Sequence, residues 1–164
     1  MIQGPEEATT LVARLELEYQ AIENNWELNR QAWERIRNGG RHELDWSALG
    51  YTLHIVYTAM ENYFLRISKA FENNLSGESW HRELVEMMQL DIPGTRPALL
   101  DNETAKLLGE LRAFRHVFRA MYDDRLDPDR MELLQKKAPQ MQAMFASAHR
   151  DFCAAVAEIG VGGT

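Results

Sequence analysis

The segment at positions 114–122, Phe-Arg-His-Val-Phe-Arg-Ala-Met-Tyr, holds the side chains of this sequence with the most specific chemistry. On a helix, Arg112, Arg115 and Arg119 share one face, because residues three and four apart are neighbours. Guanidinium groups form multidentate hydrogen bonds to phosphate and stabilise the charge that develops in phosphoryl transfer. Three adjacent cations repel one another unless negative groups lie opposite. The pattern therefore predicts either a phosphate site or ion pairs with acidic residues of neighbouring helices.

Two further residues could assist such a site. His116 lies beside Arg115 and could exchange a proton, although a solvated histidine next to an arginine explains it better. Glu61 lies in an earlier segment at the border of an apolar stripe, on the same side as His54. A half-buried carboxylate there could hold Arg115 or Arg119 in place from across the fold. A surface ion pair is an equally good interpretation of Glu61.

Long helices must position these side chains. The pattern from about Pro5 to Asn38 predicts one long helix, which Gly39 and Gly40 close. A second helix is expected after Asp45, a good N-cap, and should run to about Leu75. Its apolar residues fall at steps of three and four, which draws one stripe along a helix: Leu49, Leu53, Val56, Met60, Tyr63, Phe64, Ile67 and Phe71.

The second half of the chain is typical of shorter elements. Residues 79–90 indicate a short helix, and 91–100 form a loop because two prolines and a glycine exclude helix continuation. Asp101 or Asn102 can cap a fourth helix that continues through Tyr122. Leu107, Leu111, Phe114, Phe118 and Met121 should pack that helix into the fold.

The last helix should begin after Asp127, an N-cap candidate followed by Pro128 in the first helical position. It should end near Ile159, with 160–164 as a frayed tail. Pro139 should kink this helix or divide it, because proline removes a helical hydrogen bond. The whole chain, 1–164, is thus expected to be a single all-α domain, an up-and-down bundle of four long helices and one short helix.

Composition limits the functions that fit. The formal net charge is −7, so nucleic acid could bind only at a local basic patch. The single cysteine, Cys153, excludes an internal disulfide and fits a reducing cytosol. No apolar run reaches membrane-spanning length, and the first residues lack the basic and apolar regions of a signal peptide. We therefore expect a soluble, cytoplasmic protein without a membrane partner.

No cofactor or metal site is expected. The five histidines include no pair at helical ligand spacing, and the one Glu-x-x-His, Glu78 to His81, occurs only once. A glycine-rich phosphate loop is also missing, so the chain should not bind ATP through such a loop.

The sequence resembles the HEPN-domain proteins, specifically the HepT-like toxins encoded beside MntA-type minimal nucleotidyltransferase antitoxins. The family motif is an arginine, four residues, a histidine, one residue and a tyrosine at the end of a helix. Here "RHVFRAMY" supplies Arg115, then Ala120 at the histidine position, and Tyr122. The surrounding "ELRAFRHVFRAMYDDRLD", the upstream "WHRELVEMM" and the "IPGTRPALL" loop also look like one HepT-like subgroup. The resemblance spans most of the chain, from about Leu44 to the last helix.

This resemblance implies a HEPN-like bundle that forms a homodimer with two motifs in one cleft. Family members are typically metal-independent endoribonucleases in which the RNA 2′-hydroxyl attacks the adjacent phosphate. Arg115 would stabilise the phosphate charge, with Arg112 and Arg119 as further phosphate contacts. The antitoxin is expected to transfer AMP from ATP to the motif tyrosine, here Tyr122.

Ala120 departs from the family motif. A methyl group can neither take nor give a proton, so this chain is expected to be largely inactive. It could be a natural inactive relative or the product of a deliberate change, and the intact surroundings favour the latter. The alternative function is a non-catalytic HEPN module that docks a minimal nucleotidyltransferase. A plain dimerisation domain fits least well, because it explains neither the arginine face nor Tyr122.

Overall fold

The fold was analysed in a computed structural model, which describes residues 2, 4–71, 80–121 and 125–162. Of residues 80–82 and 160–162 only the backbone is described. The described residues form the following helices: α1 (Pro5–Arg37), α2 (Glu43–Phe71), α3 (Trp80–Met88), α4 (Asn102–Ala120), α5 (Pro128–Gln135) and α6 (Ala138–Gly162). The predicted all-α class is confirmed, and none of these helices is long and apolar enough to cross a membrane.

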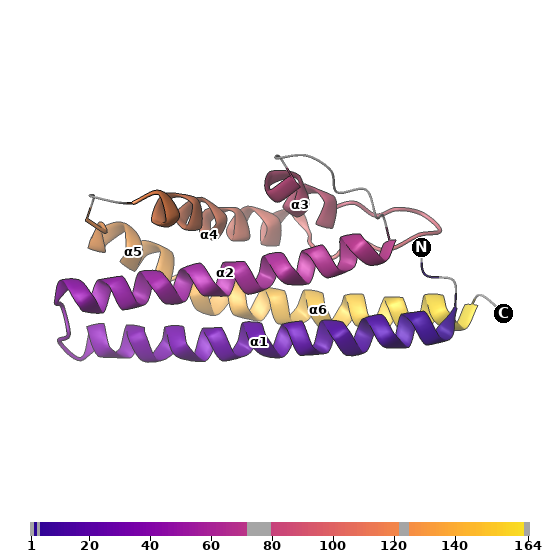
Figure 1. Cartoon of the computed structure of the whole chain (residues 1–164), viewed down its shortest axis with the longest axis horizontal. Helices are drawn as coiled ribbons and strands as arrows, with labels where there is room; N and C mark the ends of the chain where they lie inside the picture. The colour runs from indigo at the N-terminus through magenta and orange to yellow at the C-terminus, as the bar shows by residue number, and fades with distance from the viewer. Residues whose placement is uncertain (1, 3, 72–79, 122–124, 163–164) are drawn as a thin grey trace.

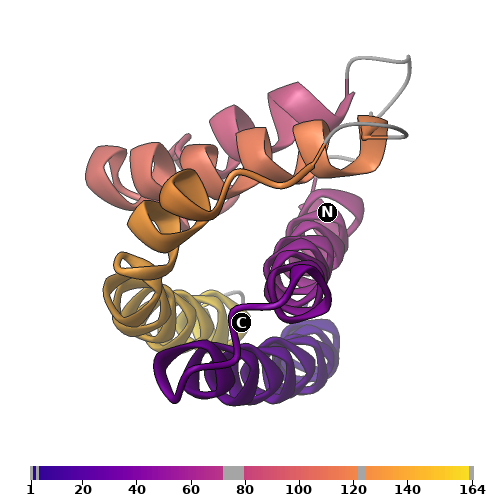
Figure 2. The same ribbon diagram turned by 90° about the vertical axis from the view of Figure 1, so that its left-hand side faces the viewer.

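The long helices run up and down. In Figure 1, α1 and α2 lie antiparallel, α6 packs along α1, and α4 returns antiparallel to α2. Figure 2 shows α1, α2 and α6 nearly end-on, with α4 slanting across them. The core between them contains fully buried aromatic rings from α2 and α6, namely Tyr57, Tyr63, Phe64, Phe145 and Phe152. These rings pack α2 against α6, and α4 packs on α2.

Proline, glycine and aspartate set most helix ends as predicted. Pro5 begins α1, and Gly39 follows its end with φ of 102°, a conformation that suits glycine. The Asp101 side chain accepts a hydrogen bond from the Thr104 N–H at 2.7 Å and caps α4. Asp127 caps α5 in the same way, through the N–H groups of Asp129 and Arg130. These caps confirm the element order predicted for the second half of the chain.

Pro139 divides the last predicted helix into α5 and α6. Gln135 ends α5, and Pro139 falls in the first turn of α6, where a missing N–H costs little. The buried side chains of Asn29 and Gln135 exchange two amide hydrogen bonds, at 2.9 and 2.7 Å, and attach the end of α5 to α1. The break between α5 and α6 therefore follows a residue, Gln135, that is hydrogen-bonded to α1.

Three predicted boundaries were wrong. Asp45 does not precede α2 but lies in its first turn, because its carboxylate accepts the N–H of His42 at 3.0 Å and pairs with Arg35. The helix α4 ends at Ala120 rather than at Tyr122, since Met121 already has extended backbone angles. The helix α6 continues beyond Ile159 to Gly162.

The loop between α3 and α4 is tied down by a buried arginine. Arg96 is 2% exposed, and its guanidinium donates to the carbonyl oxygens of Met87 at 2.8 Å and Leu90 at 2.9 Å. These carbonyls lie at the C-terminal end of α3, where helical partners are missing. These bonds fix the loop against the end of α3, and the loop leads directly to Asp101, the N-cap of α4.

Candidate functional site

Arg115 points from α4 into the interface with α2. Its Nε donates to Thr58 Oγ1 at 3.2 Å, and its two terminal nitrogens donate to the two carboxylate oxygens of Glu61 at 3.4 and 3.2 Å. The guanidinium also lies 5.8 Å from the ring centre of Tyr57. Arg115 is thus held by three neighbouring residues of one helix face.

The pair of Arg115 and Glu61 is largely shielded from solvent. The side chain of Arg115 is 12% exposed and that of Glu61 is 6% exposed. Glu61 was predicted to hold either Arg115 or Arg119, and in the structure it pairs with Arg115. The carboxylate balances the charge of this arginine and orients its guanidinium plane.

A glycine of α2 allows α4 to approach this closely. A Cβ atom built on Gly50 would lie 2.9 Å from Cε2 of Phe118 and 3.2 Å from Cδ1 of Leu126. Such distances are too short for carbon atoms, so any larger residue would push the end of α4 outward. Gly50 was not predicted as a functional residue, because a glycine inside a helix marks neither a turn nor a cap.

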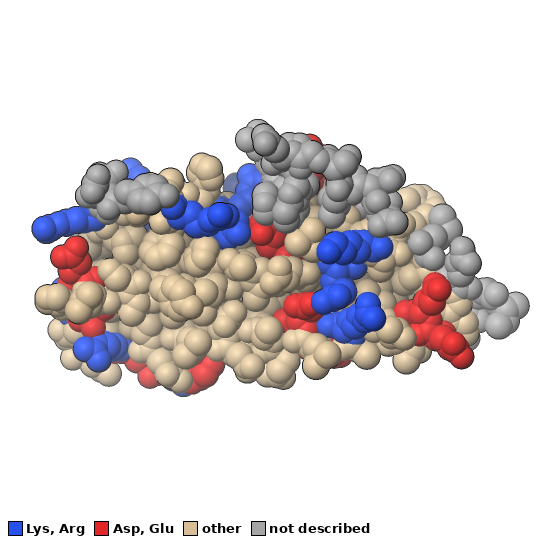
Figure 3. All heavy atoms as spheres, viewed as in Figure 1, with Lys and Arg blue, Asp and Glu red and all other residues tan. Residues whose placement is uncertain are grey.

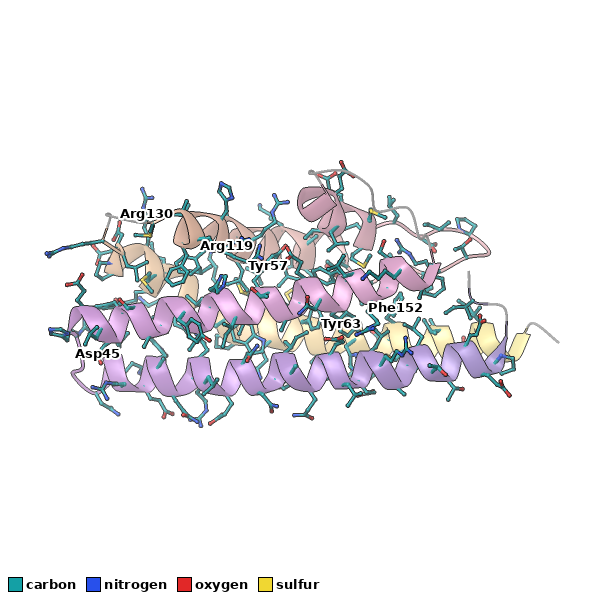
Figure 4. All side chains as sticks on the ribbon, in the orientation of Figure 1. Asp45, Tyr57, Tyr63, Arg119, Arg130 and Phe152 are labelled. Carbon is teal, nitrogen blue, oxygen red and sulfur yellow. The ribbon has the colours of Figure 1, made fainter. Side chains whose placement is uncertain are left out.

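The remaining motif residues lie on the surface. His116, Arg119 and Ala120 are exposed, and Arg112 is partly buried. Figure 4 shows Arg119 on the part of α4 that borders α2 and Tyr57. Arg119 is exposed, and among the described residues it forms no ion pair. Tyr122, predicted as the AMP acceptor, lies outside the described residues.

The structure adds His54, which sequence analysis used only to place Glu61. Its ring packs against Phe118, with ring centres 5.6 Å apart. Burial lowers the pKa of His54, the charges of Arg115 and Arg119 lower it further, and Glu61 acts in the opposite sense. The sequence offered only one indication of this role for His54, its spacing. His54, Thr58 and Glu61 are four and three residues apart and so share one face of α2.

An uncharged strip of α2 borders the motif. The strip consists of residues at steps of three and four that are exposed or partly exposed: Leu44, Ser47, Ala48, Tyr51, Ile55 and Thr58. Leu44 is 72% and Tyr51 56% exposed, and both lie on this strip. Figure 3 shows this face with few charged atoms over α2 and with lysine and arginine side chains along the edge of α4.

One group among the described residues could offer three metal ligands, and it lies on the other side of α2. Glu16, His149 and Cys153 place ligand atoms within 4.8 Å of one another. His149 already uses Nδ1 in a 2.8 Å hydrogen bond with Tyr63 and Nε2 in a 3.2 Å contact with Glu16. Burial raises the pKa of the Cys153 thiol to about 11. These contacts join α1, α2 and α6, and none of them involves the motif.

Comparison with known proteins gives one family. Residues 48–156 match the model of a family described as HepT-like protein. The matched range contains Gly50, His54, Glu61 and the complete motif segment. Neither a curated protein nor a solved structure gives a significant match to the chain.

Proposed function

This chain belongs to the HepT-like family, and from this membership and the site we propose that it is the toxin of a toxin–antitoxin pair, a metal-independent endoribonuclease. The observation that carries the proposal is the arrangement of the motif arginine, Arg115, and of Arg119. Glu61 holds Arg115 at the α2 interface, and Arg119 is exposed one helical turn later. A phosphate at this edge would find the exposed guanidinium of Arg119 one turn after the oriented guanidinium of Arg115.

Ala120 accounts for the expected weakness of the reaction in this chain. In RNA cleavage the 2′-hydroxyl attacks the adjacent phosphate and the 5′-oxygen leaves, so one proton is removed and one is supplied. The arginines offset the phosphate charge but transfer no proton at neutral pH. The experiment that tests the proposal is the substitution Ala120→His, followed by an RNA cleavage assay in EDTA.

Assembly is the next part of the proposal. We expect a two-fold homodimer that buries the uncharged strip of α2, because a second copy would cover Leu44 and Tyr51 and bring two motifs to one cleft. Tyr51→Glu should shift the protein to monomers in light scattering at micromolar concentration. Leu17→Glu, at an equally apolar site on α1 that is 74% exposed, should leave the dimer intact. A monomeric parent chain would contradict this prediction.

Modification by the partner is expected at Tyr122. The proposed partner is an MntA-type nucleotidyltransferase, which would transfer AMP from ATP to the hydroxyl of Tyr122, three residues after Arg119 in the sequence. Incubation with this enzyme, ATP and magnesium should add AMP to the parent chain, as measured by mass spectrometry. Tyr122→Phe should gain no mass, whereas Tyr51→Phe should be labelled like the parent. Equal labelling of Tyr122→Phe would show that another residue accepts AMP.

A further inference from the structure

His54 is linked to Arg115 through a chain of hydrogen bonds. Arg115 Nε donates to Thr58 Oγ1 at 3.2 Å, and Thr58 Oγ1 donates to the backbone carbonyl of His54 at 2.9 Å. His54 therefore lies one turn before Thr58 on the face of α2 that receives α4. Any ligand held at Arg115 would lie close to this turn.

The antiparallel packing places Arg119 at the same turn. Arg115 lies opposite Thr58, and α4 runs in the direction opposite to α2. One turn further along α4 thus corresponds to one turn back along α2, which brings Arg119 beside His54. The ring contact between His54 and Phe118 agrees with this register. Consistent with this register, the charges of both Arg115 and Arg119 act on the imidazole.

The protonation state of His54 suits a proton acceptor. The charged groups that act on it are Arg115 and Arg119 from α4 and Glu61 from its own helix. Burial and the two cations lower its pKa, so the ring is neutral at neutral pH. Nδ1 is buried and has no hydrogen-bond partner among the described residues. Exchange of a proton with a bound molecule therefore goes through Nε2.

We propose that His54 is the proton acceptor of the RNA-cleaving reaction, whereas position 120 is the place of the proton donor. This inference rests on the proposed function. Nε2 of His54 takes the proton of the 2′-hydroxyl as the 2′-oxygen bonds to phosphorus and the bond from phosphorus to the 5′-oxygen breaks. The leaving 5′-oxygen takes a proton from a histidine at position 120, or from water in this chain. A 2′,3′-cyclic phosphate and a 5′-hydroxyl result, and the imidazolium then loses its proton to solvent.

The test uses the full-length Ala120→His chain as parent, with an RNA oligonucleotide in EDTA. Adding His54→Gln should lower kcat by roughly a hundredfold or more, the usual contribution of general base catalysis, with KM little changed. It should also remove the acidic limb of the pH profile of kcat/KM, whose midpoint in the parent should lie below 6.5, the usual histidine value. His42→Gln, at an exposed histidine before α2, serves as the control and should change neither quantity.

A second variant separates chemistry from folding. His54→Ala should be inactive, and added imidazole should restore part of its cleavage because the free base can enter the space of the missing ring. If His54→Gln keeps the rate and the acidic limb of the parent, this inference is overturned while the proposed function stands. If the Ala120→His parent itself leaves RNA intact, the proposed function fails and takes this inference with it.

Discussion

Ala120→His should raise the rate of metal-independent RNA cleavage by roughly a hundred- to ten-thousandfold, the range that a positioned acid or base contributes. Ala120 is exposed at the last position of α4, so the larger side chain fits without disturbing the core. The new imidazole would lie next to Arg119 and could give its proton to the leaving oxygen. Cleavage of a labelled RNA in EDTA measures the effect, and slowed growth without antitoxin should accompany it.

Two control variants test whether the gain depends on proton transfer at position 120 and on the exposed arginine. Ala120→Gln adds a side chain of similar length that cannot transfer a proton, so it should stay at the level of the unmodified chain. In the restored chain, Arg119→Ala should abolish most cleavage by removing the exposed phosphate contact. Arg119 suits this purpose better than Arg115, whose loss would also remove the ion pair with buried Glu61 and so disturb the fold. A folded, dimeric Ala120→His chain that leaves RNA intact would favour the docking module instead.

The second large effect concerns stability. Glu61→Ala should lower the free energy of unfolding by about 3 kcal/mol, since removal of one partner leaves the other charge buried and uncompensated. Arg115 would then keep only its contacts with Thr58 and Tyr57 in this interface. Urea denaturation followed by circular dichroism measures the loss. Asn62→Ala, which shortens the exposed polar side chain at the next position of α2, is the control and should change stability by less than about 0.5 kcal/mol.

A double variant distinguishes charge from packing. Glu61→Leu combined with Arg115→Met removes both charges and keeps apolar volume, so its stability should return close to that of the parent. The same chain should bind RNA less well in the restored background, because the oriented guanidinium is gone. A Glu61→Ala chain as stable as the Asn62→Ala control would mean that this ion pair has no structural role.

The helical plan could be predicted from sequence because its signals are local. Pro128 and Pro139 lack an N–H and mark helix starts, and Asp101 and Asp127 reach the N–H groups two or three residues ahead. Asp45 shows the limit of such reasoning. An aspartate can cap the helix that follows it, or bond backwards from the first turn, and only the position of Arg35 across the loop distinguishes the two.

The site could be predicted only in part. Helical spacing placed Arg112, Arg115 and Arg119 near one another, yet it could not say which of them turns inward. That depends on the rotation of α4 against α2, which the close contact at Gly50 and the position of Glu61 determine together. His54 was missed for the same reason, since its neighbours come from a helix about sixty residues later in the chain and no local pattern links them.

If the proposed toxin function holds, Gly50 has a consequence for how cells could escape its activity. The last turn of α4, which carries Arg119 and Ala120, keeps its place because Gly50 has only a hydrogen atom facing Phe118. Substitution there would displace the motif without altering any motif residue. Selection for survivors of an active form should therefore recover changes at Gly50 as well as at the arginines. A sequence comparison confined to the motif would class such survivors as intact toxins.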